Sequence, residues 1–172
     1  MTFPGPGRSE MEGSLFGRGR AGVVLSPQLS QTREAWFPLA RVLKKRGYTA
    51  LSMDSLEENL DGEVIAGARL LRRKGASRVF AVGASKGATT VLGEAVRSDM
   101  LAGVIAVSPV LTFGDVTLRR NGISSLTEPV LIIVDENDSS IFAVEDLESW
   151  ELRDLCRKDQ RRGCSRNRLP SL

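Results

Sequence analysis

The 172-residue sequence contains no histidine, only two cysteines, and no apolar run near the roughly 18 residues that a membrane-spanning helix needs. Without histidine, the commonest general base and metal ligand is missing. Cys156 and Cys164 alone do not form a zinc site. We therefore expect no metal, no cofactor and free thiols in a reducing compartment. The start of the chain, MTFPGPGRSE, has no apolar secretory segment, so we expect a cytoplasmic protein without membrane contact.

The basic excess is confined to the end of the chain, although the net charge is +3. From residue 157 onward there are six basic residues and one acidic residue, so this segment carries +5 and residues 1–156 carry −2. Its basic residues are Arg157, Lys158, Arg161, Arg162, Arg166 and Arg168. No aromatic residue is interleaved with them for base stacking. We therefore interpret the segment as a solvated C-terminus and expect no nucleic-acid partner.

The body of the chain alternates short apolar runs with amphipathic segments, at a composition typical of one globular domain. Strands are expected at 22–28, 48–53, 79–82, 101–110 and 129–134. Helices are expected at 33–46, 61–74, 86–96 and, less regularly, 141–155. This alternation predicts an α/β fold, a three-layer sandwich with a mostly parallel sheet and helices on both faces. Residues 111–128 are too polar to predict an element.

The two ends differ from this body. Residues 1–13 are rich in proline and glycine, and we expect a flexible N-terminus before a domain spanning 14–155. Residues 156–172 show neither helical nor strand periodicity, which predicts a disordered basic tail or a reading-frame or truncation scar. A G-x-G-x-x-G match at Gly17, Gly19 and Gly22 precedes a strand instead of following one, so it does not indicate a dinucleotide site.

The segment Gly83-Ala84-Ser85-Lys86-Gly87 matches G-x-S-x-G between a buried strand and a helix. This context is the one that a nucleophile elbow requires, because the sharp turn exposes the serine hydroxyl and small flanking residues allow the turn to close. The Lys86 N–H would then begin a helix and point at a developing oxyanion. A glycine-rich turn without catalysis is the alternative. A phosphate site is disfavoured because the lysine precedes the second glycine, unlike a P-loop.

From about Gly22 to Trp150 the sequence resembles the α/β-hydrolase superfamily, most closely its small esterases and dienelactone-hydrolase-type members. The resemblance rests on VVLSPQLSQTREAWFPLARVLKKRGYTALSMD, VFAVGASKGATTVL and PVLIIVDENDSSIFAVEDL. It implies an α/β-hydrolase fold and hydrolysis of carboxylic esters or lactones, with an ester-like small molecule as substrate. It also implies that Ser85 is the nucleophile and Asp138 the acid, with Asp115 as the fallback.

The resemblance further implies an oxyanion hole formed by the backbone N–H of Lys86 and that of Gln28 or Leu29. Pro27-Gln28 stands where this family usually has a His-Gly pair, and Asp135 stands where the turn before the acid usually has glycine. Both replacements restrict the backbone. Lys86 does not replace the missing base, because sequence neighbours on a helix do not face each other.

The missing histidine is the largest departure, because the family's imidazole takes the serine proton and follows the acid in the chain. We therefore expect a chain truncated before the strand that carries histidine, with any esterase activity reduced by several orders of magnitude. A non-catalytic relative that binds a small ligand or a partner is the second hypothesis. An uncovered sheet edge would favour marginal stability, aggregation or self-association.

Overall fold

The computed structural model describes residues 1–56, 60–135, 137–140, 143, 146–147, 155–159 and 163–166. Its centre is a sheet in the order β1-β2-β4-β3-β5-β6-β9-β10-β11. These strands are β1 (Thr2–Pro4), β2 (Glu10–Phe16), β3 (Ala21–Ser26), β4 (Thr49–Met53), β5 (Arg78–Ala84), β6 (Val104–Val107), β9 (Val130–Asp135), β10 (Leu155–Asp159) and β11 (Gly163–Arg166). From β4 through β10 every neighbouring pair is parallel, and the outer pairs are antiparallel. The predicted mostly parallel sheet is therefore confirmed.

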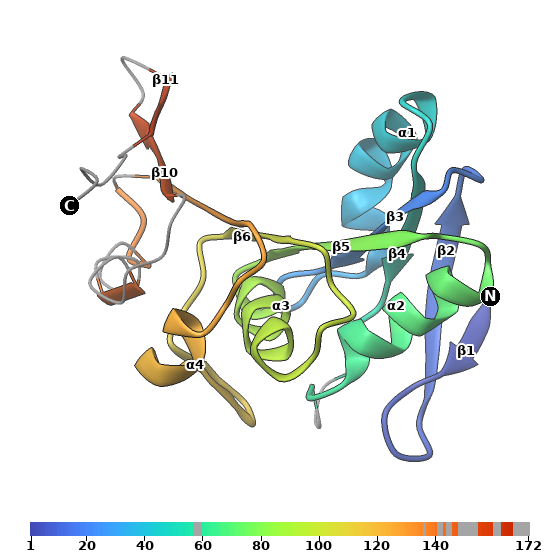
Figure 1. Ribbon diagram of the computed structural model, residues 1–172, viewed down its shortest axis with the longest axis horizontal. Helices are drawn as coiled ribbons and strands as arrows, with labels where there is room; N and C mark the ends of the chain where they lie inside the picture. Colours follow the sequence, from blue (N-terminus) through green and yellow to red (C-terminus); the bar gives the residue numbers. More distant parts are fainter. Residues whose placement is uncertain are drawn as a thin grey trace.

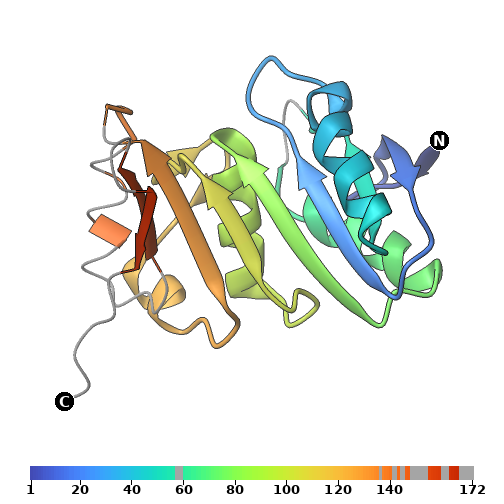
Figure 2. The same ribbon diagram turned by 90° about the horizontal axis from the view of Figure 1, so that it is seen from above.

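Helices lie on both faces of this sheet, as the sequence predicts. Figure 1 shows α1 (Phe37–Lys45) on one face, and α2 (Glu63–Arg73), α3 (Lys86–Arg97) and α4 (Arg120–Ser124) on the other. A short 3-10 turn, η1 (Arg33–Trp36), leads into α1. The view in Figure 2 shows that α1 covers the part of the sheet formed by β3 and its neighbours, with α3 and α4 behind the strands. The chain thus forms the expected three layers.

The burial pattern of the strands follows these layers. All five residues of β4 are buried, as parallel strands covered on both sides require. In β6 and β9, buried residues alternate with half-buried ones. The larger core cluster lies under α2 and α3, and a smaller one around Val23, Leu25 and Ala40 lies under α1. The two cores therefore fill the space on either side of the sheet.

The N-terminal segment differs from the flexible lead-in that its prolines and glycines predict. Residues 1–13 contain β1 and the start of β2, which pair as a hairpin with Phe3 opposite Met11. Both side chains are buried in the larger core. Burial of these two apolar side chains stabilises a hairpin that local composition disfavours.

Residues 111–128, for which no element is predicted, form the hairpin of β7 (Thr112–Phe113) and β8 (Val116–Thr117) followed by α4.

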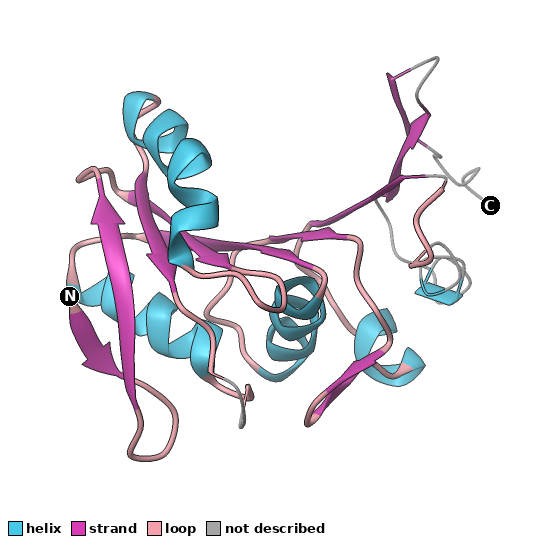
Figure 3. Ribbon diagram, turned by 180° about the vertical axis from the view of Figure 1, so that it is seen from behind, coloured by secondary structure: helices cyan, strands magenta, loops and turns pink. Residues whose placement is uncertain are grey.

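The C-terminal segment also contains structure that its sequence pattern does not predict. Strand β10 continues the sheet in parallel beside β9, with Leu155 opposite Ile132, and β11 pairs with β10 (Figure 3). An open strand edge presents a row of unpaired backbone groups, so it can template a strand without apolar alternation in the added segment. Most of the helix predicted at 141–155 lies outside the described residues.

Candidate active site

Ser85 occupies the turn between β5 and α3 in a conformation that serine rarely adopts. Its φ is 49° and its ψ is −114°. The Ser85 N–H donates to the Val107 carbonyl at 2.8 Å, and the Ser85 carbonyl accepts from the Thr89 N–H at 3.0 Å. A positive φ at a non-glycine residue costs about 1–3 kcal/mol and persists only where the surroundings enforce it. The strand, sharp turn and helix predicted around G-x-S-x-G are all present.

The two glycines of this motif are required by close backbone contacts. A Cβ atom on Gly83 would lie 2.1 Å from the Gly87 carbonyl oxygen. A Cβ on Gly87 would lie 2.4 Å from the Ser26 carbonyl oxygen and 2.8 Å from that of Pro27. No side chain fits at such distances. Because Gly87 has no side chain, the loop that follows β3 packs directly against the start of α3.

Gln28 and Leu29 lie in that loop and are exposed. The Gln28 carbonyl accepts from the Gln31 N–H at 3.2 Å, and Ser30 has a φ of 60°, so the segment forms a tight turn. Within the described part of the chain, neither the Gln28 nor the Leu29 backbone N–H has a hydrogen-bond partner. Two unpaired donors therefore lie in the loop that touches the elbow.

Asp138 follows β9 and is held by hydrogen bonds at both carboxylate oxygens. The Ser108 hydroxyl donates to Oδ2 at 2.6 Å, and the Ser140 N–H donates to Oδ1 at 2.9 Å. The Ser108 bond, followed by the Ser140 bond, lowers the pKa of Asp138 below its usual value. Ser108 immediately follows Val107, the residue bonded to Ser85. The last residue of β6 and the residue that follows it therefore connect the Ser85 and Asp138 segments.

Ser108 is a site residue that sequence reasoning missed. Its φ is 51°, and its N–H donates to the Ile133 carbonyl at 2.8 Å, so it joins the ends of β6 and β9. The strand expected at 101–110 includes Ser108, whereas β6 ends at Val107, so no local pattern marked this serine as a turn residue of the site. Asp135 stands where the family's turn usually has glycine, but its φ is not positive, so the turn does not need a glycine there. Its carboxylate accepts the Asn137 N–H at 3.0 Å, so the turn to Asp138 closes without the usual glycine.

Asp115 lies elsewhere, in the turn between β7 and β8. Its carboxylate accepts a hydrogen bond from the Leu60 N–H at 3.2 Å. Asp115 thereby ties this hairpin to the segment that precedes α2. Asp138, in contrast, contacts the end of β6 beside the elbow.

Three charged residues that the sequence did not single out as a group are buried behind the elbow. Glu63, Glu94 and Lys86 are 0%, 1% and 6% exposed. Burial raises the pKa of each glutamate to about 7, against hydrogen bonds that lower it. The Lys86 ammonium also lowers the pKa of Glu63 and donates to the Leu56 carbonyl at 3.2 Å. The Lys86 side chain is therefore directed to Leu56 and Glu63. The sequence excluded Lys86 as the base but did not predict these contacts.

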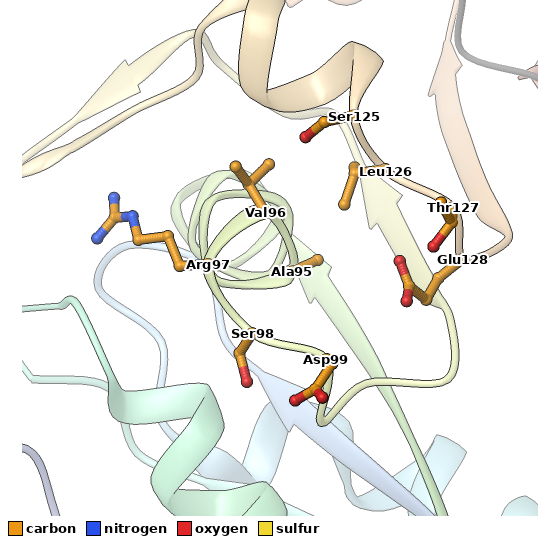
Figure 4. Close-up of a pocket in the computed structure, with 9 residues that line it drawn as sticks. All are labelled: Ala95, Val96, Arg97, Ser98, Asp99, Ser125, Leu126, Thr127 and Glu128. Atoms are coloured by element: carbon orange, nitrogen blue, oxygen red, sulfur yellow. The ribbon is translucent and has the colours of Figure 1, made fainter.

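A cavity of about 450 Å³ lies at the other end of α3. Figure 4 shows its lining residues, 95–99 at the end of α3 and 125–128 before β9. The elbow does not contribute to it.

Among the described residues, no cluster of acidic or cysteine side chains could hold a metal ion. In the same part of the chain, no helix combines the length and apolarity needed to span a bilayer.

No protein-family model matches the sequence, and no curated protein matches it. Solved structures do match the fold. An esterase from Pyrococcus furiosus is 15% identical with a TM-score of 0.78, over 92% of this chain and 79% of that chain. The esterase domain of a Rhodothermus marinus protein is 15% identical with a TM-score of 0.74, over 93% and 86%. Dienelactone hydrolase from Anabaena variabilis is 19% identical with a TM-score of 0.72, over 87% and 79%. This chain therefore has the α/β-hydrolase fold.

Proposed function

We propose that this protein is a serine hydrolase of the carboxylic-ester or lactone type, acting by acyl transfer through Ser85. The observation that carries the proposal is the strained Ser85 backbone at the strand-to-helix turn. A turn of this kind exposes the hydroxyl to a substrate carbonyl. Solved structures similar in fold include two esterases and a dienelactone hydrolase, which supports this reaction class by analogy.

The proposed roles follow from the site. The Ser85 hydroxyl oxygen attacks the ester carbonyl carbon, the bond to the leaving oxygen breaks, and water later releases the acyl group as an acid. The backbone N–H of Lys86 and that of Gln28 or Leu29 stabilise the oxyanion. Asp138 takes the position of the acid, with Ser108 holding its carboxylate. Because the chain has no histidine, the Ser85 proton passes to solvent or to an added base.

Labelling with a fluorophosphonate probe tests the nucleophile directly. We expect slow, stoichiometric labelling of the wild type at Ser85, located by peptide mass spectrometry, and none in Ser85→Ala. Added imidazole should accelerate labelling and the hydrolysis of an activated ester, because it supplies the missing proton acceptor. Ser125→Ala is the control, since this exposed serine lies at the other end of α3 from the elbow. Equal labelling of the wild type and Ser85→Ala would refute the proposal.

The second candidate is a non-catalytic protein that binds a small apolar ligand or a partner at the same edge of the sheet. The absence of histidine favours it. This candidate predicts no Ser85 labelling, with or without imidazole, in a protein that is folded by circular dichroism. The same probe therefore separates the two functions.

A further inference from the structure

Lys86 follows the nucleophile directly, and its side chain is almost completely buried. It is 6% exposed, and its ammonium donates to the Leu56 carbonyl at 3.2 Å. Lysine is rarely buried to this extent unless it is paired, because removing an ammonium from water is costly. The carboxylate of Glu63, which is fully buried, is close enough for the Lys86 ammonium to lower its pKa. The pair lies between α3, which begins at Lys86, and α2, which begins at Glu63.

The backbone of Leu56 is held between these two side chains. Its N–H donates to the Glu63 carboxylate at 2.9 Å, while its carbonyl accepts from the Lys86 ammonium. The Ser55 hydroxyl adds hydrogen bonds of 2.8 and 2.9 Å to the two Glu63 oxygens. The buried Ser26 hydroxyl, at the end of β3, also lowers the pKa of Glu63, although it makes no hydrogen bond of standard geometry. Glu63 therefore links the ends of β3 and β4 to the start of α3.

This arrangement is poorly explained by stability alone. Replacing buried opposite charges by apolar side chains of similar size is often neutral or stabilising, so burying Lys86 and Glu63 together is not the most stable way to fill this part of the core. Buried charges do hold the surrounding backbone in place, because each charge is stable only where it keeps its hydrogen bonds, here to the Leu56 backbone. Geometry matters at this point of the chain, because the adjacent Ser85 backbone is strained and is held by its surroundings.

We propose that Lys86 and Glu63 are positioning residues that hold the Lys86 backbone N–H where it stabilises the oxyanion formed at Ser85. The inference rests on the proposed function. Neither side chain touches the reacting atoms in this role. Lys86 anchors the first turn of α3 through its own side chain, and Glu63 fixes the Lys86 ammonium and Leu56 together.

Glu94 provides a matched control within the same buried cluster. It is 1% exposed, and its two carboxylate oxygens accept the Val64 N–H at 3.1 Å and the Ile65 N–H at 2.8 Å. It therefore caps the start of α2 rather than anchoring the elbow. Glu94→Gln should alter stability without changing the reactivity of Ser85. Among the residues that the structure describes, the charged groups that act on Glu63 are Lys86 and Glu94, both on α3.

The experiment compares second-order rates of fluorophosphonate labelling, with imidazole present, in folded samples of the wild type and four variants. Lys86→Met and Glu63→Gln should each slow labelling about 10- to 100-fold, the range expected when an oxyanion donor is displaced. Lys86→Arg, which keeps the charge, should recover much of that loss, and Glu94→Gln should stay within about twofold of the wild type. The ratio of wild-type to Glu63→Gln rates should also rise as the pH increases through about 7, as Glu63 ionises.

Hydrogen exchange measured on the same samples reports the anchoring of the elbow independently of the reaction at Ser85. The Lys86→Met and Glu63→Gln variants should exchange the amides of residues 84–88 at least tenfold faster than Glu94→Gln. Labelling that is equal in the wild type, Lys86→Met and Glu63→Gln would leave Ser85 as the nucleophile and refute the positioning role. Absence of labelling in the wild type would refute the proposed function. Unchanged exchange at residues 84–88 would refute the anchoring in either case.

Discussion

The buried glutamates make folding stability depend on pH in a direction opposite to that of most carboxylates. The pKa of Glu63 is raised from 4.5 to about 7 in the folded chain, mainly by burial. Between these two values the folded state binds more protons than the unfolded state, so stability falls as the pH rises. The contribution is fully present below about pH 4.5 and is lost once the pH exceeds about 7. Glu94 acts in the same direction.

The magnitude follows from that pKa difference. At about 1.4 kcal/mol per pKa unit, the change from 4.5 to about 7 corresponds to about 3 kcal/mol for Glu63. Domains of this size are typically stable by only about 5–15 kcal/mol. The Glu63→Gln variant removes the titration and keeps an oxygen that can accept the Leu56 N–H. Relative to the wild type, it should therefore gain about 3 kcal/mol between pH 4.5 and pH 8.

The assay is urea unfolding followed by tryptophan fluorescence, at constant ionic strength, from pH 4.5 to pH 8. The quantity of interest is the difference in unfolding free energy between Glu63→Gln and the wild type at each pH. Asp138 acts in the opposite direction, because its pKa is lowered, and its effect falls near and below pH 3.8, outside this range. A difference that stays constant with pH would show that Glu63 does not titrate in this window and would refute the reasoning.

Two further predictions concern the turns that follow β5 and β6. Gly87→Ala should destabilise the fold by about 2 kcal/mol or more in urea unfolding, because its Cβ would lie 2.4 Å from the Ser26 carbonyl oxygen. Gly47→Ala, where a Cβ meets nothing within 4 Å and only the positive φ opposes it, should cost less, and equal costs would contradict the crowding argument. Ser108→Ala should raise the pKa of Asp138 toward its usual value, because it removes the largest cause of the lowering, as followed by carbon-13 NMR titration of the carboxyl carbon. The exposed neighbour Ser139 provides the control variant Ser139→Ala, and matching titrations would show that the Ser108 bond is unimportant.

Part of the candidate site could be predicted from the sequence because it is local. The turn that contains Ser85 needs residues that are adjacent in the chain, and the required glycines are visible at Gly83 and Gly87. Ser108 was missed because its contact with Asp138 joins residues 30 apart. No local pattern distinguishes such a serine from an ordinary turn residue. The same reason hid the association of Lys86 with Glu63, which comes from a different helix.

The sequence by itself determined the alternation of the central strands and helices, the three-layer architecture and the elbow at Ser85, because hydrophobic periodicity and glycine spacing act over a few neighbouring residues. Only the tertiary structure showed that strands form at both ends of the described chain. Phe3 and Met11 convert a proline- and glycine-rich start into a hairpin by burial in a distant core, and β10 forms on the open edge of β9. It also decided that Lys86 is buried beside Glu63. These outcomes depend on long-range burial and pairing, which a local pattern does not encode.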